Sequence, residues 1–145
     1  MGTLLVEYAR ANTRGGHQRV YVSTSTDDGS HWSTGVRVSA DNTLGAFPAA
    51  VGVGEDTFRI TFQDRRTGLW NTWSRGSTDG GQTWSGAERI SNATHGASYL
   101  SKKGFGEAYG DYEEVTLTNT GAIFAAWGAG PSYLGPGGVW YNRTT

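Results

Sequence analysis

The sequence contains no cysteine, which excludes disulfide bonds and thiolate metal sites. Only two of its 12 basic residues are lysines, and a net charge of −1 with a pI near 6.3 offers no electrostatic footprint for nucleic acid. No apolar run approaches the ~18 residues that a membrane helix needs. No signal peptide precedes the strand-like segment from Leu4, so the protein is either cytoplasmic or has lost an export signal, and its localisation stays open.

The chain is rich in glycine and in aromatic residues. It carries 23 glycines in 145 residues, with 12% aromatic and 36% hydrophobic residues, whereas average glycine usage is about 7%. Many glycines and aromatics with few long apolar runs are typical of short strands joined by tight turns. Because no helical period appears, the composition predicts a single all-β domain over residues 1–145.

An internal repeat organises the chain. The segment 25–32 (STDDGSHW) aligns without a gap with 77–84 (STDGGQTW), at an offset of 52 residues. Identities continue on both sides of this match: Arg14 with Arg66, Gly16 with Gly68, Ser33 with Ser85, Arg37 with Arg89 and Ser39 with Ser91.

The repeated motif predicts a hairpin turn. Asp27 and Asp79 are placed to accept hydrogen bonds from backbone N–H groups across the turn. The glycine two positions later permits a positive φ, and the final tryptophan folds back beneath the turn. We therefore interpret both aspartates as structural and not as catalytic.

The motif S-x-D-x-G-x-x-W is the Asp-box, and two copies about fifty residues apart resemble the sialidase (BNR, or Asp-box) superfamily. The resemblance implies a β-propeller in which each box joins the third and fourth strands of a blade, away from the active site. One family motif is not matched: its Phe/Tyr-Arg-Ile-Pro segment precedes the first box, whereas the nearest string here, 58–61 (FRIT), follows that box and lacks the proline.

The boxes anchor a layout of three blades, at about 1–42, 43–96 and 97–145. The middle blade has four expected strands, at 47–53, 57–63, 71–77 and 88–91. The leading blade has three, at 4–8, 19–25 and 36–39, and the trailing blade has three, at 113–117, 122–127 and 138–143.

Three partial blades bury their faces only against further blades, and propellers close with about 4 to 8 of them. We therefore expect a homodimer that completes a six-bladed, sialidase-like ring. The alternative is that the chain is a piece of a longer propeller.

Ligands of propellers bind at loops around the central channel, and three segments fall there: 64–68 (DRRTG), 12–16 (NTRGG) after Arg10, and 103–114 (KGFGEAYGDYEE). In the last segment, Gly110 to Tyr112 resembles a stretch seen in bacterial Asp-box proteins of uncertain activity. The sialidase resemblance implies an arginine clamp for a substrate carboxylate, a tyrosine nucleophile paired with a glutamate, and an aspartate acid/base. The candidates for substrate binding are Arg65, Arg66, Arg14 and Arg10, and those for catalysis are Asp111, Glu113, Tyr109, Tyr112 and Asp64, with Glu114 as an alternative partner to Glu113.

These candidates leave more than one chemistry open. Carboxylates that converge at the channel either raise one another's pKa, giving an acid and a base, or bind a hard cation such as Ca²⁺ through Asp111 and Glu107. A solvated acidic turn is the structural alternative for that segment, and an ion pair at the blade edge is the alternative for Asp64 to Arg66. The three histidines, His17, His31 and His95, are expected to face solvent.

Three function classes follow. The first is a hydrolase acting on a glycoside or on a phosphate or sulfate ester in the channel. Authentic exo-sialidase activity is not expected, because a symmetric dimer cannot reproduce an asymmetric catalytic set. The second is a non-catalytic propeller that binds a small glycan by stacking on exposed Trp70, Trp73 and Trp140. The third is a structural or engineered propeller fragment.

Overall fold

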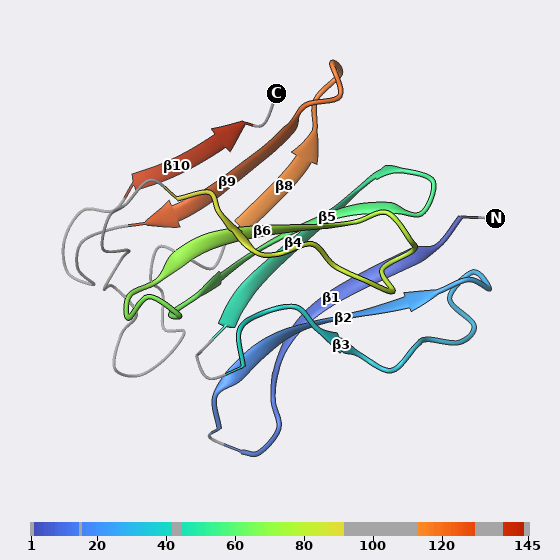
Figure 1. Ribbon diagram of the computed structural model, residues 1–145, viewed down its shortest axis with the longest axis horizontal. Coiled ribbons are helices and arrows are strands. Elements are labelled where there is room, and N and C mark those ends of the chain that lie inside the picture. The colour runs from blue at the N-terminus through green and yellow to red at the C-terminus, as the bar shows by residue number, and fades with distance from the viewer. Residues whose placement is uncertain (1, 15, 42–44, 92–112, 130–137, 144–145) are drawn as a thin grey trace.

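The computed structural model describes residues 2–14, 16–41, 45–91, 113–129 and 138–143, which form three antiparallel sheets (Figure 1). The leading sheet contains β1 (Leu4–Ala11), β2 (Gln18–Ser25) and β3 (Val36–Arg37). The middle sheet contains β4 (Gly45–Gly54), β5 (Thr57–Asp64), β6 (Asn71–Ser77) and β7 (Glu88–Arg89). The trailing sheet contains β8 (Glu113–Leu117), β9 (Ile123–Ala129) and β10 (Gly138–Arg143). No helix that could cross a bilayer occurs among these residues.

The all-β prediction is confirmed, and each expected strand has a counterpart. β1 is longer than expected, since it runs to Ala11. The expected strands 36–39 and 88–91 pair over only two residues each. In the leading sheet the reason is that the Val20 carbonyl accepts both the Val38 amide (2.9 Å) and the Ser39 amide (3.4 Å), which ends the regular ladder.

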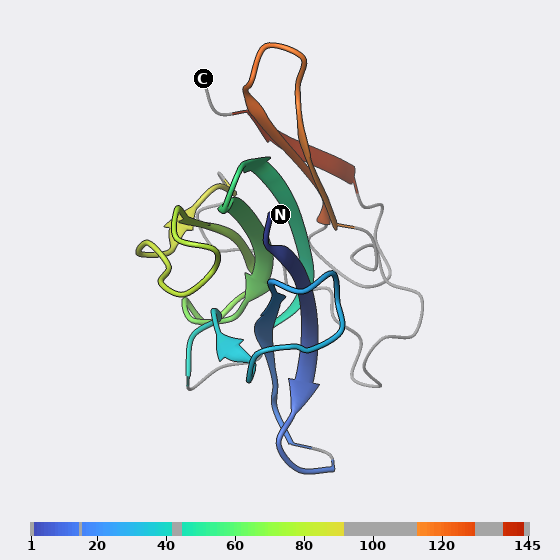
Figure 2. The ribbon, with the colours of Figure 1, turned by 90° about the vertical axis from the view of Figure 1, so that its right-hand side faces the viewer.

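The middle sheet lies between the other two, as Figures 1 and 2 show from two directions. Its edge strand β4 contacts β1 and β2 on one side and β8 on the other, while β5 also contacts β8. β4 and β8 are the first strands of the middle and trailing sheets, whereas β1 corresponds by the repeat to the second strand β5. β3, β7 and β10 lie at the opposite edges of the three sheets.

The seam between the leading and middle sheets is apolar. Val20 and Val22 of β2 pack against Ile60 and Phe62 of β5, and none of the four is more than 1% exposed. Each such side chain contributes about 1.5–3 kcal/mol when it is fully buried. This seam is the main hydrophobic core of the chain.

The seam between the middle and trailing sheets is more polar. Its apolar part joins Ala49 and Ile90 to Val115, Ala125 and Trp127. Beside it lies a cavity of about 40 Å³ with mixed lining: Arg59, Thr61, Ser74, Glu88, Ile90, Ile123, Ala125 and Asn142. The two seams therefore differ in the character of the residues that hold them.

Residues related by the sequence repeat make equivalent backbone hydrogen bonds. Val38 N donates to Val20 O at 2.9 Å, and 52 residues later Ile90 N donates to Thr72 O at 3.0 Å. The bonds from Ser33 N to Thr24 O and from Ser85 N to Gly76 O are likewise equivalent, at 2.8 Å each. Residues related by the offset of 52 thus occupy equivalent places in the leading and middle sheets.

Both Asp-box turns have the expected geometry. The Asp27 Oδ1 atom accepts the His31 amide, and the Asp79 Oδ1 atom accepts the Thr83 amide, each at 2.9 Å. The box glycines have φ of 86° and 83°, and the indole of Trp84 donates back across its turn to Gly81 O at 3.1 Å. The structural interpretation of these turns is confirmed.

Candidate functional site

The loops and the Asp-box turns lie at opposite ends of the sheets (Figure 1). The second box meets the β4–β5 turn, where Gly80 N donates to Asp56 O at 2.8 Å. The loops at 12–17 and 65–70, which join the second and third strands expected in the leading and middle blades, lie at the other end, together with the start of β8. The end that the boxes leave free therefore holds the candidates that belong to the described part of the chain: Arg10, Arg14, Asp64, Arg65, Arg66 and Glu113.

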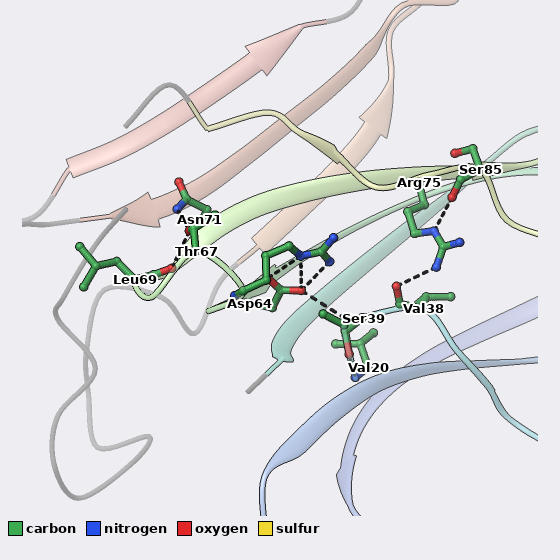
Figure 3. A network of polar contacts seen from close by, with 11 residues as sticks. Val20, Val38, Ser39, Asp64, Thr67, Leu69, Asn71, Arg75 and Ser85 are labelled. Atoms are coloured by element: carbon green, nitrogen blue, oxygen red, sulfur yellow. Dashed lines mark hydrogen bonds and ion pairs between the residues drawn. The ribbon is translucent and has the colours of Figure 1, made fainter. Parts of the chain in front are cut away.

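Asp64, at the end of β5, is fully buried in an ion pair with Arg66 (Figure 3). Arg66 Nη2 lies 2.6 Å from Asp64 Oδ2, and Arg66 Nε donates to both carboxylate oxygens at 2.9 and 3.0 Å. The amides of Arg66 (3.2 Å) and Ala40 (3.4 Å) also donate to this carboxylate. The guanidinium lies 4.1 Å from the ring centroid of Trp73. These contacts describe the ion pair that we considered as the structural alternative.

A second half-buried arginine, Arg75, ties the middle sheet to the leading one. Arg75 Nη1 donates to Val38 O at 2.9 Å, and Arg75 Nε donates to Ser85 O at 2.5 Å (Figure 3). Arg75 Nη2 donates to Trp84 O at 3.0 Å. Burial, together with the charge of Arg66, lowers the pKa of Arg75. The sequence did not single out Arg75, although its charge within a strand was a visible signal.

The four predicted substrate-binding arginines fall into two pairs on different sheets. Arg65 is exposed and donates to Gly68 O of its own loop at 3.0 and 3.3 Å, while Arg66 is held by Asp64. On the leading sheet, Arg14 is exposed, and the exposed Arg10 stacks on Tyr21 at 4.9 Å. Within the described part of the chain, no hydrogen bond or ion pair joins one pair to the other.

Glu113, the first residue of β8, has a buried carboxyl group. Neither of its oxygens has a hydrogen-bond partner of normal geometry in the described structure, and the same holds for the hydroxyl of the facing residue Thr61. Burial raises the pKa of Glu113 well above its ordinary value, and the nearby Thr61 hydroxyl offsets part of that rise. Burial in the seam between the middle and trailing sheets therefore favours the neutral form of this carboxyl group.

Two further carboxyl groups come from β1 and β8. Glu7 on β1 is half-buried, and Glu114 on β8 is exposed. Burial raises the pKa of Glu7, and the charge of Glu114 raises it further, while a backbone hydrogen bond lowers it. The structure thus places two carboxyl groups from different sheets within electrostatic reach. Sequence reasoning missed Glu7, although an acidic residue inside the apolar run 4–8 (LLVEY) was an available signal.

Two of the three tryptophans proposed for sugar stacking are buried, so that prediction is wrong for them. Trp70 is 5% exposed and meets Phe47 edge to face at 6.0 Å. Trp73 is 9% exposed, because it lies in the seam with the leading sheet and under Arg66. Trp140 is 48% exposed, as expected.

Several predicted residues lie outside the described ranges: Tyr109, Asp111, Tyr112, Glu107 and His95. Their catalytic, calcium-binding and solvent-facing roles remain predictions. The described residues contain no cluster of three or more His, Cys, Asp or Glu side chains that could hold a metal ion. His17 and His31 are exposed, as expected, and His31 Nδ1 lies 2.6 Å from the Asp-box carboxylate of Asp27.

Comparison with solved structures finds proteins whose fold is similar to that of this chain. The α-L-arabinanase of Penicillium chrysogenum complexed with arabinobiose matches with a TM-score of 0.68 and 14% identity, over 98% of this chain and 41% of that one. The α-L-arabinofuranosidase of Fusarium graminearum, in a variant complexed with an iminosugar inhibitor, matches with a TM-score of 0.67 and 15% identity, over 99% of this chain and 41% of that one. The GH93 α-L-arabinofuranosidase of the same organism, complexed with arabinobiose, matches with a TM-score of 0.67 and 14% identity, over 98% of this chain and 41% of that one.

No protein-family model matches the sequence, and no curated protein matches it significantly. The structural likeness shows a β-propeller fold, and the chain spans about two fifths of the length of the structures it matches. The propeller prediction is confirmed at this level. The narrower sialidase-like assignment, the six-bladed ring and the dimer remain predictions.

Proposed function

We propose that this chain forms part of a propeller hydrolase that cleaves a glycosidic bond at the central channel, with Glu7 and Glu114 as its reacting carboxyl groups. The observation that carries the proposal is that the half-buried Glu7 of β1 has a pKa raised by burial and, in addition, by the charge of Glu114 on β8, while both strands pack against β4. The structures of similar fold include an α-L-arabinanase complexed with arabinobiose and an α-L-arabinofuranosidase. That likeness favours a glycoside over a phosphate or sulfate ester as the substrate.

The two carboxyl groups suit the two roles that glycoside hydrolysis requires. Glu7, half-buried and with a raised pKa, donates its proton to the departing glycosidic oxygen as the bond from that oxygen to the anomeric carbon breaks. Glu114, exposed on β8, acts as the carboxylate on the other side. It either accepts a proton from the attacking water or attacks the anomeric carbon before water does. In both routes one water is consumed and its hydroxyl ends on the anomeric carbon.

The remaining candidates take supporting places in the proposal. Glu113 stays neutral beside Thr61 and holds the start of β8 against the middle sheet. Arg10 and Arg14, exposed at the loop end of the leading sheet, supply positive charge for an acidic substrate. Tyr109, Asp111 and Tyr112 precede β8 in sequence and remain candidates for substrate contacts. Calcium binding by Asp111 and Glu107 is a separate prediction.

A channel exists only in a closed ring of blades, so ring closure belongs to the proposal. A second copy of this chain would supply the missing blades and give a six-bladed ring of the sialidase type. The site would then occur twice, related by a two-fold axis.

The experiment compares three isosteric variants, Glu7→Gln, Glu114→Gln and Glu113→Gln, on two kinds of substrate. The first is 4-nitrophenyl α-L-arabinofuranoside, whose leaving group departs without a proton. The second is an arabinose disaccharide, whose leaving group needs one. We expect Glu114→Gln to abolish both reactions. Glu7→Gln should slow the disaccharide about 10²–10⁴-fold, because general acid catalysis contributes that much, and the nitrophenyl glycoside far less.

Glu113→Gln is the matched control, since it changes a neighbouring carboxyl group that faces the seam. If Glu113→Gln alone removed activity while the other two variants kept it, the assignment of Glu7 and Glu114 would be wrong. Turnover of 4-nitrophenyl phosphate or sulfate, but of no glycoside, would move the proposal to ester hydrolysis. Saturable binding of arabino-oligosaccharides without turnover would replace it by a glycan-binding propeller.

A further inference from the structure

The trailing sheet has an uncovered apolar face. Val139 and Tyr141 on β10 are 82% and 70% exposed, and the ring of Tyr141 stacks on Phe124 of β9 at 5.5 Å. The neighbouring residue Asn142 points to the opposite side of β10, where its amide donates to Ile90 O of the middle sheet at 2.8 Å. We call the side with Val139, Tyr141 and Phe124 the trailing free face.

The leading sheet also has an uncovered apolar face. Leu4 and Val6 on β1 are 45% and 40% exposed, whereas the alternate residue Leu5 packs into the core with the middle sheet. We call the side with Leu4 and Val6 the leading free face. Exposed apolar side chains grouped on a sheet face mark an interaction surface more often than scattered ones do.

The repeat identifies the residues of the middle sheet that are equivalent to Leu4 and Val6 of the leading free face. Val6 pairs with Ser23 on β2, and the residue 52 positions after Ser23 is Arg75, which pairs with Ile60. By the same rule Leu4 corresponds to Phe58. Ile60 is 0% exposed and Phe58 is 8% exposed. Positions equivalent to Leu4 and Val6 are therefore buried in the middle sheet.

The trailing free face has an equivalent as well. Asn142 donates to Ile90 O just as Arg75 donates to Val38 O, and Val38 and Ile90 are 52 residues apart. Asn142 therefore corresponds to Arg75, which makes Tyr141 and Val139 correspond to Ser74 and Thr72. In the leading sheet, 52 residues earlier, these positions are Val22 and Val20. Those two valines pack against Ile60 within the chain.

We infer that the leading free face of one chain docks on the trailing free face of a second copy, so that Val6 meets Val139 and Tyr141 across the interface. The partner contact repeats the apolar seam in which Val20 and Val22 meet Ile60. The inference rests on the ring closure included in the proposed function and names the surfaces that perform it. Such a contact is head to tail, and a two-copy ring contains it twice.

The test uses cysteine cross-linking, because the chain has no cysteine of its own. Val6→Cys and Tyr141→Cys are made as separate single variants, then mixed in equal amounts and oxidised. We expect a covalent dimer from the mixture and none from either variant alone. A covalent dimer from Val6→Cys alone would show that two leading faces pair with each other, which would overturn the inference.

Light scattering gives the second readout. We expect the unmodified chain to show twice its mass of 15.5 kDa, and Tyr141→Asp to halve that value without changing the circular dichroism spectrum. Leu117→Ser is the control, since Leu117 is 38% exposed and lies on neither free face; it should leave the dimer intact. A monomeric unmodified chain would overturn the inference. A dimer without turnover would instead leave the inference standing and remove the proposed hydrolase.

Discussion

Asn142 of β10 donates its side-chain amide to the carbonyl of Ile90, 52 residues away in sequence and in a different sheet, at 2.8 Å. Arg75 makes the equivalent bond to Val38 one sheet earlier, at 2.9 Å. The same join between neighbouring sheets is therefore made by two chemically different side chains. A side-chain hydrogen bond from the third strand of one sheet to a backbone carbonyl of the preceding sheet is thus a repeated feature of this chain, although the donor residue differs.

Removal of one partner of the Asp64–Arg66 ion pair should strongly lower the free energy of unfolding. Arg66→Ala leaves the fully buried Asp64 carboxylate without its counter-ion, and we expect it to cost about 3–5 kcal/mol of unfolding free energy. The double variant Asp64→Asn/Arg66→Ala should cost less than Arg66→Ala alone, because it removes the stranded charge. Urea unfolding of the three proteins measures both values. Equal losses for the single and double variants would contradict the role of the charge.

Glu113 should make the protein less stable as pH rises. Burial raises the folded-state pKa of Glu113, so above the ordinary glutamate pKa near 4.5 the unfolded chain releases a proton that the folded chain keeps. Stability from this group is then present at low pH and declines with rising pH up to the folded pKa. Glu113→Gln should remove this decline and raise the unfolding free energy at pH 7 by roughly 1–3 kcal/mol. Denaturant melts at pH 4 to 8 test the slope, with Glu114→Gln as the exposed control.

Asp79 should make the protein less stable as pH falls, whereas Glu113 makes it less stable as pH rises. Hydrogen bonds from the hydroxyl and amide of Thr83, and from Ser77, lower the pKa of Asp79 to about 2. Its stabilising contribution is therefore present above the ordinary aspartate pKa and is lost as pH falls toward 2. Asp79→Asn should lower the melting temperature at pH 6 and flatten its fall between pH 4 and 2. A parallel slope in the variant would show that other groups cause the acid loss.

The apolar seam between the leading and middle sheets should dominate stability. Ile60→Ala, at a residue with no exposed surface, should cost about 2–5 kcal/mol. Val36→Ala, at a valine of the leading sheet that is 40% exposed, should stay within about 0.5 kcal/mol of the unmodified chain. Chemical denaturation of both variants makes the comparison. A small cost at Ile60 would mean that the two sheets do not depend on this packing.

Local order could be predicted from the sequence because it depends on neighbours in the chain. The Asp-box turns follow from an aspartate, a glycine and a tryptophan within eight residues, and the backbone N–H groups that donate to each aspartate across the turn were expected. Strand positions followed from turn residues and short apolar runs. Burial was harder to predict: Trp73 was expected at the surface, because nothing in its own segment shows that a second sheet covers it.

The candidate site was predicted only in part, for the same reason. Glu113 and Asp64 were named from the sequence, yet their environments differ: burial in a seam raises the pKa of the Glu113 carboxyl group, whereas the Asp64 carboxyl group is ion-paired. Glu7 was missed, because its partner Glu114 lies more than a hundred residues away and no local pattern links them.

The sequence by itself determined the all-β class, the repeat of 52 residues and the two turns, since each depends on residue types at short spacing. Only the tertiary structure decided which faces of the sheets are buried, which charges are paired and which carboxyl groups approach one another. Those properties depend on how separate sheets stack, and stacking brings together residues whose distance along the chain carries no signal.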